Sequence, residues 1–185
     1  MRTGAGTPAR TFRFWLGDDA DASIVADEDG FLYVGVENER GTARAAQVGQ
    51  LLKIDPRRPE DPIVWSVPSS GGDKAGTWST PAVLDEVVVW PTRPGTVHGI
   101  DRDTGESLWQ VELPAPLMGS PVVVDGVWIQ GDCAGVLHGF DVSSPRVRPE
   151  ELWAVELGGC IEATPAVWKG RIYVGTRSGR LHALG

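Results

Sequence analysis

The side chains of this sequence that could carry chemistry are few: three histidines, two cysteines and a set of acidic residues. His98, His138 and His182 are enough to ligate a catalytic zinc ion. Cys133 and Cys160 could form a disulfide, remain free thiols, or bind a metal together with a nearby carboxylate. Acidic side chains supply the oxygen ligands that calcium prefers. Which of these sites can form depends on the elements that position the residues.

A repeated unit positions these side chains. It reads MGSPVVVDGVWIQGDCAGVLHGFD over residues 118–141 and recurs over 78–101, 162–185 and, more loosely, 21–55. Each copy holds a short strand, a tight turn, a β-branched and aromatic strand, a glycine turn and a third strand, and three copies continue into a strand with a tryptophan. Four antiparallel strands repeated at about 40 residues are typical of a β-propeller blade. We therefore predict an all-β fold, a β-propeller with four blades in this chain.

Turn residues recur at fixed places in the unit. Asp125-Gly126 and Lys169-Gly170 suit tight hairpins. The second turn of each copy ends in a glycine that is expected to have a positive φ, and these are Gly49, Gly95, Gly135 and Gly179. Three of the third strands end in an aspartate that can start a turn, and these are Asp55, Asp101 and Asp141.

The two ends of the chain decide how the ring closes. Residues 1–10 are expected to be a disordered lead-in, followed by a single propeller domain over residues 11–185. The last copy stops at Gly185 without a tryptophan strand, whereas Thr11–Leu16 carries an unmatched one with Trp15. This segment could complete the last blade and close a monomeric ring. Alternatively, the chain is part of a larger propeller, and a half-ring would dimerise through its open edges.

Charge and composition restrict the partners. With 17 basic and 25 acidic residues the net charge is −8, which argues against nucleic acid and anionic membranes. No apolar run is long enough to span a bilayer, and the first residues lack the apolar core of a signal peptide. The chain as written fits the cytoplasm, and a truncated start would fit an extracytoplasmic place, so the compartment stays open.

Several short motifs occur in a fixed order: Ser120-Pro121, Asp125-Gly126, Gly135 to Asp141, Asp103-Thr104-Gly105 and Leu152-Trp153. With these motifs the repeats resemble those of the PQQ-like β-propeller family, over residues 21–185. That family includes quinoprotein alcohol dehydrogenases, outer-membrane assembly lipoproteins and many proteins without assigned activity. Its dehydrogenases usually carry two adjacent cysteines beside the quinone, and this sequence has no such pair. We therefore expect no cofactor, with PQQ and calcium as the alternative.

The repeat also decides how to interpret the histidines and tryptophans. The three histidines occupy one register of the third strand, so they should be spread around the ring rather than gathered at a zinc ion. We expect no histidine chemistry. Tryptophans at the outer strands are expected to pack between blades, and these are Trp15, Trp65, Trp109 and Trp153.

One mouth of the predicted channel gathers the residues that we expect to bind a partner or ligand, because sites usually lie on the loops at one face of a rigid scaffold. These residues are Asp21, Glu37, Trp78, Met118, Asp132 and Glu162. The insertion from Glu37 to Val48 is the longest loop there. Cys133 and Cys160 should lie on the same face in adjacent blades, where a disulfide is favoured over free thiols and over a metal site.

The predicted function is a non-catalytic propeller that recognises an unknown protein or small ligand. No nucleophile elbow, P-loop, dinucleotide fingerprint or zinc-protease motif is present. The alternative is a PQQ-dependent oxidoreductase, or the C-terminal fragment of one.

Overall fold

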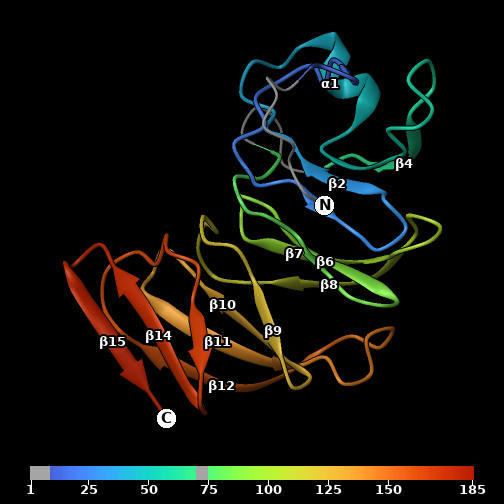
Figure 1. Cartoon of the computed structure of the whole chain (residues 1–185). Helices are drawn as coiled ribbons and strands as arrows, with labels where there is room; N and C mark the ends of the chain where they lie inside the picture. Colours follow the sequence, from blue (N-terminus) through green and yellow to red (C-terminus); the bar gives the residue numbers. More distant parts are fainter. Residues whose placement is uncertain (1–8, 70–74) are drawn as a thin grey trace.

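The four copies of the repeat form four antiparallel sheets (Figure 1). The computed structural model describes residues 9–69 and 75–185. In three sheets, four strands follow one another in chain order, whereas the fourth sheet has three strands. The all-β prediction and the predicted order of strands within each unit are therefore confirmed. Most of the expected lead-in over residues 1–10 lies outside the described residues.

The strand bounds follow the repeat closely. The first sheet contains β1 (Val25–Ala26), β2 (Leu32–Gly35), β3 (Leu51–Ile54) and β4 (Ile63–Val67). The second contains β5 (Ala82–Val83), β6 (Val87–Pro91), β7 (Thr96–Asp101) and β8 (Ser107–Glu112). The third contains β9 (Val122–Val124), β10 (Val127–Gly131), β11 (Val136–Asp141) and β12 (Glu150–Glu156). The fourth contains β13 (Ala166–Trp168), β14 (Arg171–Thr176) and β15 (Arg180–Leu184).

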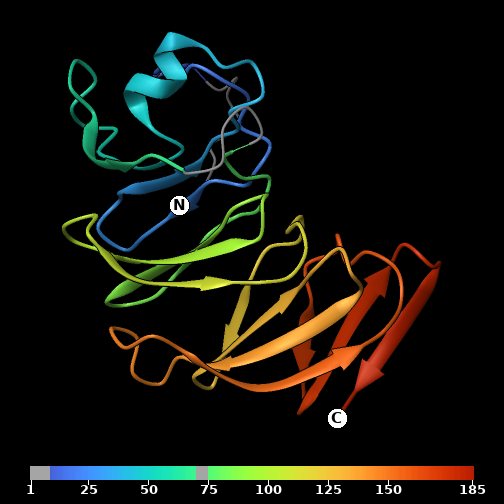
Figure 2. The same cartoon turned by 180° about the vertical axis from the view of Figure 1, so that it is seen from behind.

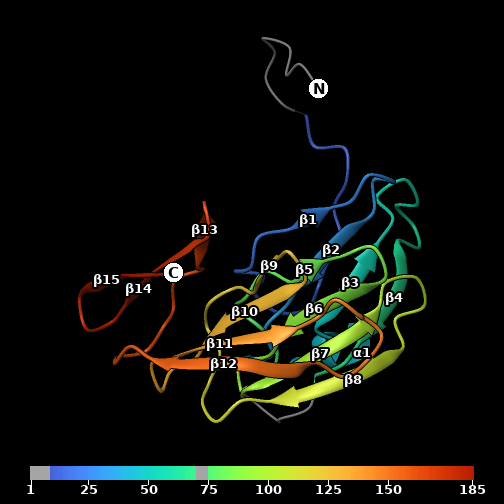
Figure 3. The ribbon, with the colours of Figure 1, turned by 90° about the horizontal axis from the view of Figure 1, so that it is seen from below.

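The sheets follow one another along an arc rather than around a closed ring (Figures 1 and 2). The first and fourth sheets lie at opposite ends of this arc, and a view from below shows the same separation (Figure 3). Strand β15 is the outer edge of the fourth sheet. The arc therefore presents one free sheet face at each end.

The turn predictions are confirmed. The four glycines before the third strands have positive φ, with values of 77° at Gly49, 120° at Gly95, 88° at Gly135 and 76° at Gly179. Both residues of the Asp125-Gly126 and Lys169-Gly170 hairpins also have positive φ, as a type I′ turn requires.

The aspartates at the ends of the third strands start turns as expected. The Asp101 carboxylate accepts hydrogen bonds from the backbone N–H groups of Asp103 and Thr104. Asp55 and Asp141 accept in the same way from backbone N–H groups two residues further along. These bonds set the turn between the third and fourth strands.

The apolar core lies between neighbouring sheets. The outer-strand tryptophans Trp65 and Trp109 are buried against the next sheet, Trp65 beside Trp90 and Trp109 beside Trp128. The Trp109 ring lies directly on Gly99, where a Cβ atom would approach the ring within 2.0 Å. Gly139 makes the same contact with Trp153 at 2.2 Å. Glycine at this position of the third strand therefore makes room for the tryptophan of the fourth strand.

The N-terminal segment departs from the prediction. Residues 11–16 form no strand and do not join the fourth sheet. Instead Phe12, Phe14 and Leu16 pack on the free face of the first sheet, and Trp15 points outward with 68% of its surface exposed. Because side chains alternate along an extended segment, burying Phe14 and Leu16 forces Trp15 to the other face. The predicted packing of Trp15 between blades is wrong. Of the two alternatives for the ring, closure by residues 11–16 of the same chain does not occur in this structure.

The insertion after Glu37 contains a short helix that the sequence analysis described only as a loop. Helix α1 spans Ala43–Val48 and is capped by Thr42, whose hydroxyl accepts a hydrogen bond from the Ala45 N–H at 3.0 Å. Ala45 and Val48 are buried against the first sheet. The insertion is thus anchored by packing.

Candidate interaction rim

Hydroxyl side chains join neighbouring sheets at the start of their first strands. The Ser23 N–H donates to the Thr80 hydroxyl at 3.0 Å, and the Thr80 N–H donates to the Ser120 hydroxyl at 2.9 Å. The Ser79 hydroxyl also donates to the Gly119 carbonyl at 3.0 Å. These bonds explain the hydroxyl residues that precede the first strands of the second and third sheets, Thr80 and Ser120. They also place the preceding residues of successive sheets side by side along one face of the arc.

We call this face of the arc the rim and define it by two positions in each copy. The first position lies two residues before the hydroxyl and is held by Asp21, Trp78, Met118 and Glu162. The second position lies two residues after the second-strand glycine or proline and is held by Glu37, Arg93, Cys133 and Arg177.

One backbone hydrogen bond ties the two positions together in every copy. The N–H of the second-position residue donates to the carbonyl two residues before the first position. The N···O distance is 2.9 Å in each of the four bonds, which run from Glu37 to Asp19, from Arg93 to Gly76, from Cys133 to Pro116 and from Arg177 to Cys160. The rim is therefore a repeated backbone feature that carries different side chains in each copy.

The most elaborate part of the rim lies between the first and second sheets. The Arg93 guanidinium stands over the Trp78 ring at 4.2 Å from its centroid and forms an ion pair with Glu39. Arg93 is half-buried, and Trp78 is partly exposed. An arginine held in this way between an indole ring and a carboxylate has a fixed orientation at the surface.

Glu37 is buried and forms a hydrogen bond with Trp78 of this pair. Burial raises the pKa of the Glu37 carboxyl, a hydrogen bond from Trp78 opposes that rise, and Asp21 adds to it. Because Trp78 can only donate, its indole N–H points at the Glu37 carboxylate. Glu37 therefore orients Trp78 rather than offering a free charge to a ligand.

Asp132, which the sequence analysis placed at the mouth, is fully buried. Its carboxylate accepts a hydrogen bond from the Val136 N–H at 2.9 Å, and its other oxygen lies 3.3 Å from the His138 Nε2 atom. Alternation after β10 turns Asp132 inward and Cys133 toward the rim. The carboxylate of Asp132 therefore supports the turn before β11.

The histidines are spread over three sheets, and two of them are buried inside their sheets. His98 packs against Trp90, and burial lowers the pKa of its imidazole. His138 lies between Asp132 and Glu151, with 2.7 Å between its Nδ1 atom and a Glu151 carboxylate oxygen. The structure does not bring the histidines together at a common site.

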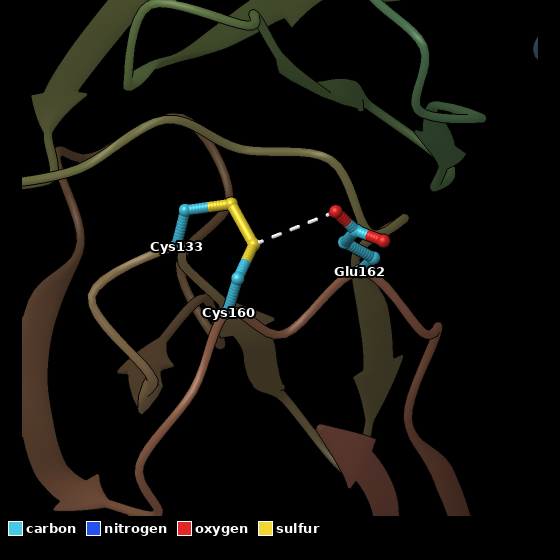
Figure 4. Close-up of side chains that lie close together, drawn as sticks. All are labelled: Cys133, Cys160 and Glu162. Carbon is cyan, nitrogen blue, oxygen red and sulfur yellow. Dashed lines mark hydrogen bonds between the residues drawn. A yellow bond between two sulfur atoms is a disulfide. The ribbon is translucent and has the colours of Figure 1, made fainter. Parts of the chain in front are cut away.

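Cys133 and Cys160 are joined by a disulfide at the rim (Figure 4). Glu162 lies beside it, with 3.8 Å between a carboxylate oxygen and the Cys160 sulfur, and it forms an ion pair with Arg177 at 3.3 Å. The three side chains are close enough to suggest a metal site. Oxidised cysteines offer no thiolate, however, and thiolates are the metal ligands that cysteine provides. The arrangement is a covalent link between the third and fourth sheets.

Comparison with known proteins identifies the family to which this chain belongs. The family model described as outer membrane protein assembly factor BamB matches residues 49–185. The chain belongs to this family of BamB-like PQQ repeats. The resemblance and the β-propeller prediction are thereby confirmed, and no curated protein matches the chain in sequence.

Solved structures show the same fold. The crystal structure of BamB from Moraxella catarrhalis superimposes with a TM-score of 0.69 and 21% identity, over 90% of this chain and 47% of that chain. The computationally designed Ika4 protein gives a TM-score of 0.66 at 13% identity, over 90% of this chain and 91% of its own. The designed Ika8 protein gives 0.65 at 12%, over 89% and 45%. The BamB-like chain thus spans about half the length of BamB.

Sequence reasoning missed Arg93 and Arg177 in this BamB-like rim. A signal was present, because both residues share the register of Glu37 and Cys133, which the sequence analysis did select. Comparing the position after each second strand across the copies would have found them.

The one helix among the described residues has six residues, far short of a bilayer span.

Proposed function

We propose that this BamB-like propeller is a non-catalytic module that binds a protein partner through its rim. The family description names an assembly factor of the outer membrane, and BamB itself is the protein so described. This chain spans about half of BamB, so the proposal is limited to partner binding. It rests on the rim that the four copies share.

The stacked pair of Arg93 and Trp78 is the observation that carries the proposal. Arginine and tryptophan are enriched among the residues that dominate binding energy at protein interfaces. Here Glu39 and Glu37 fix the two side chains before any partner arrives. A fixed pair loses little conformational entropy on binding, and this favours affinity.

The surroundings of the pair also suit a protein partner. Helix α1 and its loop rise beside the rim as a packed insertion, and Asp18 and Asp19 hold Arg40 of that insertion. The depressions beside Phe140, Trp153 and Phe14 do not include Trp78 or Arg93 in their lining. A broad surface of this kind fits a protein better than a small ligand.

The rim residues argue against a bound quinone. PQQ carries several carboxylates, and the exposed rim side chains include the acidic Asp21 and Glu162. The two cysteines come from different sheets and are not adjacent in sequence. These residues do not fit the quinone, so the proposal includes no cofactor.

Capture experiments test the rim. The tagged chain is used to capture partners from an extract of its own cells, and each partner identified is then titrated against purified chain. Trp78→Ala and Arg93→Ala should each weaken that binding by at least tenfold, since both remove part of the fixed pair.

Val147→Ala is the matched control. Val147 is 63% exposed in the turn between β11 and β12, away from both rim positions of the third sheet. It should leave binding unchanged, and circular dichroism should show that all three variants remain folded. Binding that survives both rim substitutions would rule out the rim.

The cofactor part of the proposal has its own test. Purified chain is mixed with PQQ and calcium, and quinone absorbance and dye reduction are followed. We expect neither a retained chromophore nor activity, and a stoichiometric quinone complex would overturn the non-catalytic assignment.

A further inference from the structure

Each end of the arc exposes an apolar residue that the other copies bury. Leu181 on β15 is 77% exposed. The residues at the same register in the other third strands are Leu51, Val97 and Leu137, and each of them is 0% exposed. Those three side chains pack against the next sheet along the arc. Leu181 holds the same position on the fourth sheet, but no next sheet covers it.

The free face of the first sheet exposes an apolar residue at a position where, in the other copies, the preceding sheet covers the chain. Ile24 is 57% exposed, whereas the prolines at its position in the other copies, Pro81, Pro121 and Pro165, are buried. Ile24 borders an open apolar groove of about 290 Å³ together with Phe14, Leu32 and Ile54. In the other copies this face packs against the preceding sheet.

The N-terminal segment already occupies part of that preceding sheet's place. Phe14 and Leu16 pack on the first sheet as Trp109 and Val111 of β8 pack on the third. Residues 12–16 therefore stand where the fourth strand of a preceding sheet would lie. Yet they have no strand partner among the described residues.

The fourth sheet lacks this strand. In the other sheets the third and fourth strands pair in one register, with Gly99 opposite Trp109 and Val97 opposite Val111. The pairs in the third sheet are Gly139 with Trp153 and Leu137 with Val155. The same register on β15 would put Phe14 opposite Ala183, Trp15 opposite His182 and Leu16 opposite Leu181.

This register also accounts for the exposed Trp15. Ala154 holds the corresponding position in β12 and lines a groove between the second and third sheets with Val111 and Phe140. The matching groove beside β15 is apolar, has a volume of about 320 Å³, and is lined by residues that include Trp153, Ile172 and Leu184. Trp15 would enter this groove and become buried.

We propose that two copies of this chain close one propeller ring, each supplying residues 12–16 as the missing fourth strand of the other's last sheet. Each end of the arc has what the other end lacks, and the first and fourth sheets lie at opposite ends of the arc (Figures 1 and 3). A second copy of this chain offers both missing parts. One chain spans 47% of BamB, so two copies match nearly the whole length of such a propeller. Two identical head-to-tail contacts then close the assembly.

Solution mass tests the proposal first. Light scattering on the full chain should give twice the 19.8 kDa of one copy. Leu181→Asp should give a folded monomer, because it puts a charge into the new interface. Leu152→Asp is the matched control, since Leu152 is 53% exposed on β12 outside this interface. A wild-type monomer, or an open series of larger species, would overturn the proposal.

A cross-link separates exchange between copies from closure within one chain. The double variant Trp15→Cys, His182→Cys should form a covalent dimer on mild oxidation, visible on a non-reducing gel, because the register puts the two positions opposite each other. A control with Trp15→Cys and Trp168→Cys should not cross-link. A cross-linked monomer would show that the ring closes on itself and would refute exchange.

Discussion

Arg102 shows how one side chain holds two sheets together. Its guanidinium donates to Asp27 and Glu28 of the first sheet at 3.1 Å each, and to the Tyr33 hydroxyl at 3.2 Å. Burial raises the pKa of Tyr33 to about 12. Although burial opposes it, hydrogen bonds from the Phe31 N–H and from Arg102 hold the pKa of Asp27 below its ordinary value.

Arg102→Met should therefore cost about 3–5 kcal/mol of unfolding free energy, because it leaves the buried Asp27 carboxylate without a cation. Urea unfolding measures the change. Arg177→Met is the control, since the pair of Arg177 with Glu162 is largely exposed and contributes less than about 1 kcal/mol. Equal losses in the two variants would contradict this account.

Asp101 makes stability depend on pH. The Thr104 N–H, with Arg146 and the Asp103 N–H, lowers the pKa of Asp101 to about 2, against the effect of burial. Since the folded-state pKa is below that of the unfolded chain, the stabilisation is complete above pH of about 4 and is lost as pH falls toward 2. The wild type should thus exceed Asp101→Asn in stability at pH 5, with the difference shrinking over this window. A wild type that is no more stable than Asp101→Asn at pH 5 would contradict this account.

For single residues, the sequence predicted the position in the repeat better than the direction and contacts of the side chain. It put Trp78 and Glu162 at equivalent positions of the repeat, and in the structure both lie two residues after the carbonyl that accepts the shared backbone hydrogen bond. It could not tell that Glu37 and Asp132 turn inward, since one step along an extended chain reverses the side of a side chain. Stacking of Arg93 on Trp78 depends on rotamers that a repeat pattern does not specify.

Among the elements, the link between the third and fourth sheets is covalent. The disulfide joins residues 27 positions apart, and a loop of that size contributes about 3.5 kcal/mol by chain-entropy arguments. Reduction should therefore lower the melting temperature of the wild type. The double variant Cys133→Ala, Cys160→Ala should melt at the lower temperature with or without reductant. A wild-type melting curve that reductant leaves unchanged would contradict a disulfide.

The strands were predictable because their turns use residues with strong backbone preferences, such as Gly95 and the Asp125-Gly126 pair. Helix α1 was not predictable, because six residues are too few to show the periodic spacing of apolar residues that indicates a helix. Its existence depends on burying Ala45 and Val48 against the first sheet. Tertiary packing, rather than local preference, fixes this element.

For the whole molecule, how the arc is closed was the least predictable feature. The repeat predicts how one sheet packs on the next, and apolar side chains fill the three interfaces between successive sheets. It does not state whether the last sheet meets the first of the same chain or of another. The side chains of Phe14 and Leu16 pack on the first sheet without strand pairing, and Ile24 and Leu181 remain exposed at the two ends of the arc.

If two copies share the ring, unfolding must also separate them. The melting temperature should then rise with protein concentration, by several degrees between about 1 and 100 μM, because dilution favours separated chains. Calorimetry over that range measures the trend. In the Leu181→Asp variant the dependence should vanish, and a wild-type melting temperature independent of concentration would count against sharing.

The bond between Cys133 and Cys160 spans the turn region that carries Arg146 and Arg148. A single tryptic cut there would leave two polypeptides that still travel as one particle. The severed pieces would separate only after denaturant and a reducing agent were applied together. The last sheet is therefore tethered to its neighbour even after its own backbone connection has been lost.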